Sequence, residues 1–315
     1  MKLTRRQLLI SAGATGVVGC LGAGIMSRGS KPVFQWRGSA MGGEARIALY
    51  GVDQDTAKVA MTAAAQEIER LEMIFSLHRA GSELSRLNSK GILLAPSRDL
   101  VDVLRAAQDW RRRTEGAFDP TVQPLWQAAA KNADLKAAMS TVGTKIDVSP
   151  AQVTLPAAAA LTLNGIAQGT IADRVTEILH RYGLDDVVIN AGELRLPGRT
   201  RRPIGIPSAK AVVAVAEVAI ATSEPHTLIF DQSADRHHLF DPRTGESPNH
   251  WKSLSVFAPT AEMADALSTA FAVSLVDAVA DFTSTIGDIA VIGADYTGRI
   301  YRFGTLPIAG AATVP

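Results

Sequence analysis

Apolar residues recur at helical spacing in four segments of the chain. The first segment carries its apolar face at Ala64, Ile68, Leu71 and Phe75. A second helix is expected to begin near Ser97 and to stop at Gly116. A third covers 171–179 and ends at Gly183, and a fourth covers 261–275.

Strand-like patterns lie between these helical segments. We expect a pair of strands over 33–50, and buried strands at 186–190, 211–222 and 253–260. The tail is expected to form a hairpin that turns near 296–298, and the Ala-rich segment 127–160 a connecting helix with short strands. Helices mixed with antiparallel strands, without a clear linker, predict an α+β fold with one globular unit of several lobes over 29–315.

The first 28 residues have the pattern of an export signal. Arg5 and Arg6 precede an apolar run from Leu8 to Ile25, and this arginine pair favours the twin-arginine export route. The apolar run holds several glycines, which favours a cleaved signal over a membrane-spanning helix. Cys20 stands in V-V-G-C, which resembles a bacterial lipobox, so it would carry a lipid anchor; alternatively it is discarded with the signal. We therefore expect an exported, periplasmic protein, either soluble or anchored to the inner membrane.

Charge and cysteine content exclude several classes of protein. The net charge is +1, and removal of the three basic residues in 1–19 leaves 1 − 3 = −2, which offers no general attraction to nucleic acid. A single cysteine allows no internal disulfide. The chain also lacks a dinucleotide-binding glycine motif, a phosphate-binding Walker loop, a zinc-protease motif and a serine-hydrolase elbow.

Four local clusters remain as candidate chemistry, each with a structural alternative. The run H-H-L-F-D-P-R-T-G at 237–245 is turn-like but rich in reactive groups. Asp265 and Thr269 lie four residues apart, so on a helix they share one face and could supply oxygen ligands to Mg²⁺, or simply stabilise the helix. A glycine loop at 164–169 could approach a phosphate or a cation, and 116–121 is a turn with an aromatic residue that could equally fill the core.

These clusters occur in order with further motifs: A-M-G-G at 40–43, S-E-L-S-R-L-N at 82–88, G-A-F-D-P-T-V-Q-P at 116–124, N-G-I-A-Q-G-T-I-A-D-R-V at 164–175, N-A-G at 190–192, A-T-S at 221–223 and A-P-T-A-E-M-A-D-A-L-S-T at 258–269. Together they resemble the ApbE family of FAD:protein FMN transferases, over about 41–275. The resemblance implies an α+β, T-fold-related domain whose lobes hold FAD and one Mg²⁺.

The resemblance also implies roles for individual residues. Asp265 and Thr269 would bind Mg²⁺ with their side chains, and Gly165 with its carbonyl. His238 would lie near the pyrophosphate and, with Asp265, serve catalysis. The positions implied to contact FAD are Met41, His78, Ala117, Phe118, Asp119, Thr162, Gln168, His238, Phe240 and Arg243.

The implied reaction attacks the FMN-side phosphorus of FAD with a Ser or Thr hydroxyl of a partner and releases AMP. The acceptor would be a flavoprotein of an exported or membrane electron-transfer system. The chain departs from the family pattern at Thr162, where an Asp is usual, at Gln168, where a Lys is usual, and at His78, where a Tyr is usual. FAD hydrolysis at the same site, or a non-catalytic flavin-binding module, are therefore alternatives.

Overall fold

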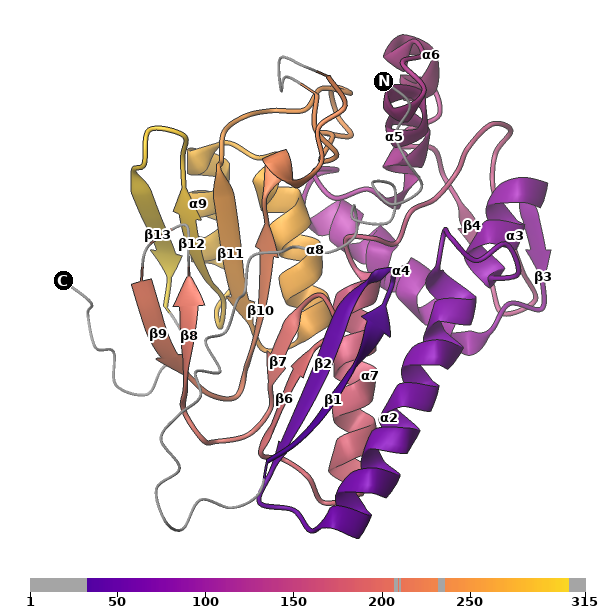
Figure 1. Ribbon diagram of the computed structural model, residues 1–315. Helices are drawn as coiled ribbons and strands as arrows, with labels where there is room; N and C mark the ends of the chain where they lie inside the picture. Colours follow the sequence, from indigo (N-terminus) through magenta and orange to yellow (C-terminus); the bar gives the residue numbers. More distant parts are fainter. Residues whose placement is uncertain (1–32, 207–208, 210, 232–235, 306–315) are drawn as a thin grey trace.

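The computed structural model describes residues 33–206, 209, 211–231 and 236–305; the expected export signal and Cys20 lie outside them. The described chain builds an antiparallel sheet in the order β1-β2-β6-β7-β10-β11-β12-β13 (Figure 1). Its strands are β1 (Val33–Ala40), β2 (Gly43–Tyr50), β6 (Val187–Asn190), β7 (Leu194–Leu196), β10 (Val218–Ser223), β11 (Ser253–Ala258), β12 (Ala290–Ala294) and β13 (Ile300–Gly304).

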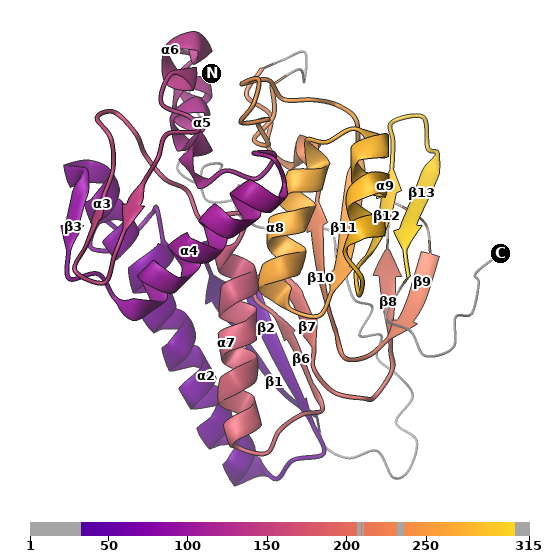
Figure 2. The ribbon, with the colours of Figure 1, turned by 180° about the vertical axis from the view of Figure 1, so that it is seen from behind.

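Long helices cover one face of this sheet, as Figure 2 shows from the helical side. They are α2 (Gln54–Phe75), α7 (Ala167–Arg181), α8 (Ala261–Ala272) and α9 (Val276–Thr285). The opposite face is covered in part by a separate hairpin of β8 (Arg202–Ile206) and β9 (Ala211–Val215). The sheet is thus buried on both sides where the three layers overlap.

Strand β10 is buried on both of its faces, which explains why its sequence is almost continuously apolar. Val218 and Ile220 pack toward the β8–β9 hairpin, whereas Ala219 and Ala221 pack toward the helices. Successive side chains of a strand point to opposite faces, so a strand between two cores needs apolar residues at every position.

A smaller lobe, residues 76–164, lies beside the helical layer. It contains α3 (Glu83–Lys90), α4 (Arg98–Arg113), the 3₁₀ turn η1 (Pro120–Val122), α5 (Gln123–Ala130), α6 (Leu135–Met139) and a small sheet in the order β3-β5-β4. The strands of that sheet are β3 (Ile92–Leu94), β4 (Asp147–Val148) and β5 (Gln152–Thr154). These elements confirm the α+β class and the expectation of distinct lobes.

Helix α4 begins and ends where its sequence predicts. The hydroxyl of Ser97 accepts a hydrogen bond from the Leu100 amide at 3.2 Å, so it satisfies one of the unpaired N–H groups of the first turn. Gly116 follows the helix with φ +82°, and its amide donates to the Arg111 carbonyl at 2.8 Å. Glycine adopts this left-handed conformation without strain and therefore ends the helix.

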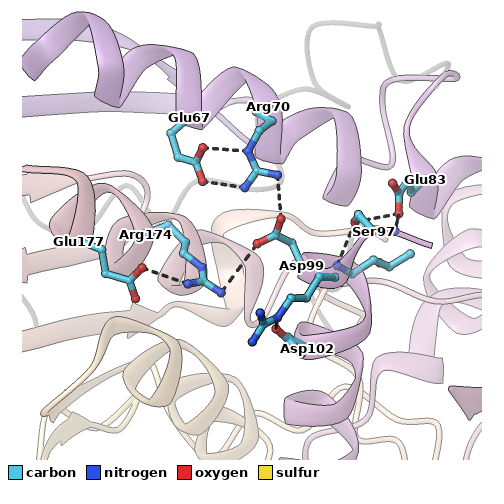
Figure 3. Close-up of polar contacts among 10 residues, drawn as sticks. Glu67, Arg70, Glu83, Ser97, Asp99, Asp102, Arg174 and Glu177 are labelled. Carbon is cyan, nitrogen blue, oxygen red and sulfur yellow. Dashed lines mark hydrogen bonds and ion pairs between the residues drawn. The ribbon is translucent and has the colours of Figure 1, made fainter. Parts of the chain in front are cut away.

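A shared carboxylate ties three helices of the two lobes together (Figure 3). Asp99 of α4 accepts from Arg70 of α2 at 2.7 Å and lies 3.7 Å from Arg174 of α7. Glu67 pairs with Arg70 and Glu177 pairs with Arg174 on their own helices. Exposed pairs contribute little one by one, but a carboxylate between two helices fixes their spacing.

The structure corrects two expectations. The run 211–222 is not one strand, because the chain reverses at Glu217 (φ +51°) and its halves join different sheets as β9 and β10. The helix expected over 261–275 stops at Ala272, and α9 begins at Val276. Helix α3 (Glu83–Lys90) also forms over the S-E-L-S-R-L-N motif, for which no element was predicted. The strand pair at 33–50 and the terminal hairpin are confirmed.

In the described ranges no helix is both long and apolar enough to traverse a bilayer.

Candidate functional site

A pocket of about 130 Å³ lies between the helical layer and the smaller lobe. Its walls come from the loop before α7, the first turn of α7, the β6–β7 turn, the end of β10, helix α5 and one face of α8. The lining residues that the argument uses are Trp126, Thr162, Gly165, Gln168, Glu193, His238, Phe240, Asp265 and Thr269.

The oxygen-rich part of the pocket is built from α8 and the loop before α7. Asp265 and Thr269 are one helical turn apart and both line the pocket, so they share a face as their spacing predicts. A β-carbon at Gly165 would lie 2.6 Å from the Thr269 hydroxyl oxygen. Glycine is required there because any side chain would displace Thr269, and its backbone is thereby brought beside the α8 oxygens.

Buried carboxyl groups dominate the electrostatics of the pocket. Burial raises the pKa of Asp265 to about 8, although the Gly169 amide, which donates to its Oδ2 at 3.0 Å, opposes the rise. Burial and then the charge of Asp265 raise the pKa of Glu193 well above its usual value. Among the described residues that line the pocket there is no Lys or Arg. A bound cation would therefore offset a repulsion that the protein leaves uncompensated.

The donor set fits a hard cation such as Mg²⁺. Carboxylate, hydroxyl and backbone carbonyl oxygens are its preferred ligands, and it retains water or phosphate oxygens at other positions. Nowhere in the described ranges do three or more His, Cys, Asp or Glu side chains gather as a metal cluster. A site that uses Asp265, Thr269 and the Gly165 carbonyl is consistent with that finding.

The adjacent residues His237 and His238 have different surroundings, and only His238 lines the pocket. The His237 ring lies 3.1 Å from the Pro248 carbonyl through Nε2, and its Nδ1 accepts from the Leu239 amide at 3.3 Å. His238 lines the pocket, and its buried Nδ1 has no hydrogen-bond partner among the described residues. Burial lowers the pKa of each ring to about 4, so His238 is neutral at pH 7 and can accept a proton.

Aromatic side chains form an apolar surface next to these polar groups. Phe240 and Trp126 both line the pocket. Phe230 joins them, stacked on Phe240 with ring centroids 6.1 Å apart and edge-on to Trp126 at 5.4 Å. Such a surface suits the flat ring of a flavin or an adenine.

Comparison with known proteins identifies the chain's relatives. The model of the ApbE family matches residues 41–292. The chain belongs to the ApbE family.

Individual ApbE relatives agree with this assignment. The FAD:protein FMN transferase of Treponema pallidum is 28% identical over 64% of this chain and 68% of its own, and that of Haemophilus influenzae is 29% identical over 62% and 66%. The crystal structure of Pseudomonas stutzeri flavinyl transferase ApbE, apo form, shares the fold with a TM-score of 0.77 at 20% identity, over 88% of this chain and 97% of that one.

The ApbE pocket includes only part of the residue set that the sequence implies. Thr162, Gly165, Gln168, His238, Phe240, Asp265 and Thr269 line it together. Met41, Ala117 and Phe118 are packed in the main core, and His78 is exposed outside the lining. Their contacts with FAD stay predictions.

Asp119 and Arg243 lie outside the lining and organise loops around it. Asp119 accepts from the Thr121 amide and hydroxyl and pairs with Arg111 at 2.6 Å. Arg243 forms a two-point contact with Asp241 at 2.8 Å, and its side chain lies beside Gly116. The 116–121 turn and the 237–245 loop therefore support each other.

The departures from the ApbE pattern also have places in the structure. The Thr162 hydroxyl accepts from the Asn164 amide at 3.2 Å, a local turn that an Asp would also make. Gln168 packs on Gly192, where a β-carbon would lie 1.9 Å from its Nε2, and that nitrogen is buried without a partner among the described residues. Gln168 thus offers the pocket a neutral donor in place of a cation.

Sequence reasoning did not assign Trp126 and Glu193 to the pocket. Trp126 lies two residues after the 116–124 motif, so its position next to that motif could have indicated that it belongs to the pocket. Glu193 follows Gly192 directly, and its burial in the pocket depends on the β6–β7 turn, which the sequence pattern does not reveal.

Proposed function

We propose that this protein transfers FMN from FAD to a Ser or Thr hydroxyl of a partner protein, in a reaction that requires Mg²⁺ and releases AMP. The observation that carries the proposal is one pocket that joins the Asp265–Thr269–Gly165 oxygen set to a neutral histidine and an aromatic surface. A nucleotide that contains both a pyrophosphate and flat rings matches these three features. Kinship to curated FAD:protein FMN transferases supports the same reading.

Asp265, Thr269 and the Gly165 carbonyl would hold the Mg²⁺. When bound, the ion neutralises charge on the phosphate oxygens during displacement at phosphorus. Phe240 and Trp126 would hold a ring of FAD and thereby fix the pyrophosphate relative to the ion. The Gln168 amide would donate a hydrogen bond to a phosphate oxygen.

The chemical step is a transfer between two oxygens. The acceptor hydroxyl oxygen forms a bond to the FMN-side phosphorus, and the bond from that phosphorus to the AMP oxygen breaks. AMP leaves with the electron pair, and the acceptor proton passes to the neutral ring of His238, whose Nδ1 has no hydrogen-bond partner among the described residues. Water in place of the acceptor would give FMN and AMP.

Incubation of residues 29–315 with FAD, Mg²⁺ and candidate acceptor domains tests the proposal. We expect an acceptor mass increase equal to FMN and a fluorescent acceptor band, both abolished by EDTA and by Asp265→Ala. Asp277→Ala, an exposed carboxylate on α9, is the matched control and should leave transfer unchanged. Intact FAD with every acceptor would support a binding module, and free FMN and AMP alone would support a hydrolase.

We also propose that the protein acts outside the cytoplasm on an exported or membrane redox protein. The twin-arginine pattern at Arg5-Arg6 and the lipobox-like context of Cys20 support this proposal. Metabolic labelling with a tagged fatty acid distinguishes the two mature forms. Label lost in Cys20→Ser would support a lipid anchor, whereas an unlabelled periplasmic protein would support a soluble one.

A further inference from the structure

Helices α7 and α8 cross in close contact beside the pocket. A β-carbon at Gly169 of α7 would lie 2.2 Å from the carbonyl oxygen of Ala261, the first residue of α8. The backbones therefore touch at the point where both helices begin. The position of α8, which carries Asp265 and Thr269, depends on this crossing.

Asp173 of α7 caps the start of α8 across the crossing. Its Oδ1 accepts from the Ala261 amide at 3.0 Å, and its Oδ2 accepts from the Glu262 amide at 2.9 Å. Thr260, the residue before α8, caps the next amide, that of Met263, at 3.3 Å. A carboxylate from another helix thus satisfies two of the N–H groups that a helix start leaves unpaired, and its charge suits that end of the helix dipole.

The arrangement is reciprocal. Helix α7 follows Ile166, which provides no side-chain cap, and Asp265 of α8 accepts from the Gly169 amide at 3.0 Å in its first turn. Each helix therefore supplies a carboxylate to the start of the other. The Asp265 contact uses Oδ2, which leaves Oδ1 for another partner.

Arg195 of β7 holds Asp173 from the sheet side. Its Nε lies 3.3 Å from Asp173 Oδ1, and both side chains are largely buried. The Asp173 side chain is therefore held between the sheet and α8 and does not turn toward solvent. Glu177 and Glu262 bring further negative charge close to Asp173, and Arg195 supplies a positive charge that balances it.

We propose that Asp173 is a positioning residue for the Mg²⁺ site. It fixes the first turn of α8 against α7, and so sets where Asp265 and Thr269, one and two turns further along α8, meet the Gly165 backbone. This inference rests on the proposed function for its metal, but not on any catalytic step. Residues that orient metal ligands commonly change metal affinity by about 10- to 100-fold when they are replaced.

Binding of Mn²⁺ as a Mg²⁺ substitute, followed by electron paramagnetic resonance without FAD, tests the proposal. We expect Asp173→Asn, which keeps the size of the side chain but loses the charge and one acceptor, to weaken Mn²⁺ binding about tenfold or more. Asp173→Glu, which keeps the carboxylate, should restore part of that affinity. Asp53→Asn is the matched control, because Asp53 caps the start of α2 by the same chemistry outside the pocket lining.

Circular dichroism and the FAD kinetics complete the test. The Asn variant should keep its helical spectrum and show a raised Mg²⁺ requirement, with kcat approaching the wild-type value at saturating Mg²⁺. If Asp173→Asn does not fold, Arg195→Lys, which loosens Asp173 but keeps the cation, takes its place. Wild-type Mn²⁺ affinity in the Asp173 variants would overturn the positioning role alone, whereas a wild-type protein that binds no Mn²⁺ would overturn the metal-dependent function as well.

Discussion

The consecutive residues His237 and His238 differ in function because their ring nitrogens have different hydrogen-bond partners. His237 uses both nitrogens inside the protein, as a donor to Pro248 and an acceptor from Leu239, which fixes one neutral tautomer. His238 lines the pocket, and its buried Nδ1 has no hydrogen-bond partner within the described residues. Of these two histidines, only His238 lines the pocket and is therefore placed to exchange a proton with a bound substrate.

Replacement of His238 by Ala should slow FMN transfer about a hundredfold or more, because a general base typically contributes that much. Affinity for FAD should change much less, since the ring is one of many contacts. Initial rates with excess acceptor and fluorescence titration of FAD separate the two effects. His226→Ala is the control, because His226 is exposed and bonded to Asn249 outside the lining. An unchanged rate would assign the base to another group.

At the scale of elements, the site depends on how closely α7 and α8 approach. Ala is normally favoured over Gly inside a helix by roughly 0.5–1 kcal/mol. At Gly169 the added methyl would meet the Ala261 carbonyl, so the usual gain is replaced by overlap with a backbone that cannot move freely.

Gly169→Ala should accordingly lower the free energy of unfolding by about 1–3 kcal/mol, the usual range for overpacking. Urea denaturation with an unchanged m-value would measure it. Gly287→Ala serves as the control, because a β-carbon there has no neighbour within 4 Å among the described atoms. A stabilised Gly169→Ala protein would mean that the two helices can separate without cost.

The sequence predicts helices and strands well where buried residues recur with a regular period. It predicts them poorly where the chain reverses within a run of residues whose pattern does not change. Helices α2, α4 and α7 each bury one stripe, so their spacing reveals them. The reversal at Glu217 falls inside a run that is apolar on both sides, so no change of pattern marks it.

The same limit applies to the pocket. The Asp265–Thr269 pair follows from helical spacing, but the approach of Gly165 to Thr269 and of Gln168 to Gly192 joins residues distant in sequence. Such contacts depend on tertiary packing. The order of the motifs implied the set of site residues, and the fold shows which of these residues lie together in the pocket.

At the scale of the whole molecule, buried histidines connect stability to pH. Burial holds the pKa of His237 near 4, whereas an unfolded histidine titrates near 6.5. Between these values the unfolded chain binds the proton and the folded chain does not, so acidification through pH 6.5 to 4 favours unfolding.

The free energy of unfolding should therefore fall more steeply on acidification in the wild type than in His237→Gln. The difference between the two proteins from pH 7.5 to 4.5 should be about 1–3 kcal/mol, from a shift of roughly two pKa units at 1.36 kcal/mol each. Comparison of the two proteins cancels contributions from Asp265 and Glu193, whose raised pKa values act in the opposite direction. Parallel pH profiles would show that His237 titrates normally.

The hydrogen bond from Gly169 to Asp265 turns one backbone amide into a reporter. The same carboxyl group that would bind the ion accepts this N–H, so any charge arriving at Asp265 changes the shielding of the Gly169 nitrogen and proton. A nuclear magnetic resonance titration that follows this one signal could therefore read the occupancy of the site directly, in unmutated protein and without turnover. It would also separate ions that reach the α7–α8 junction from those that bind elsewhere on the surface.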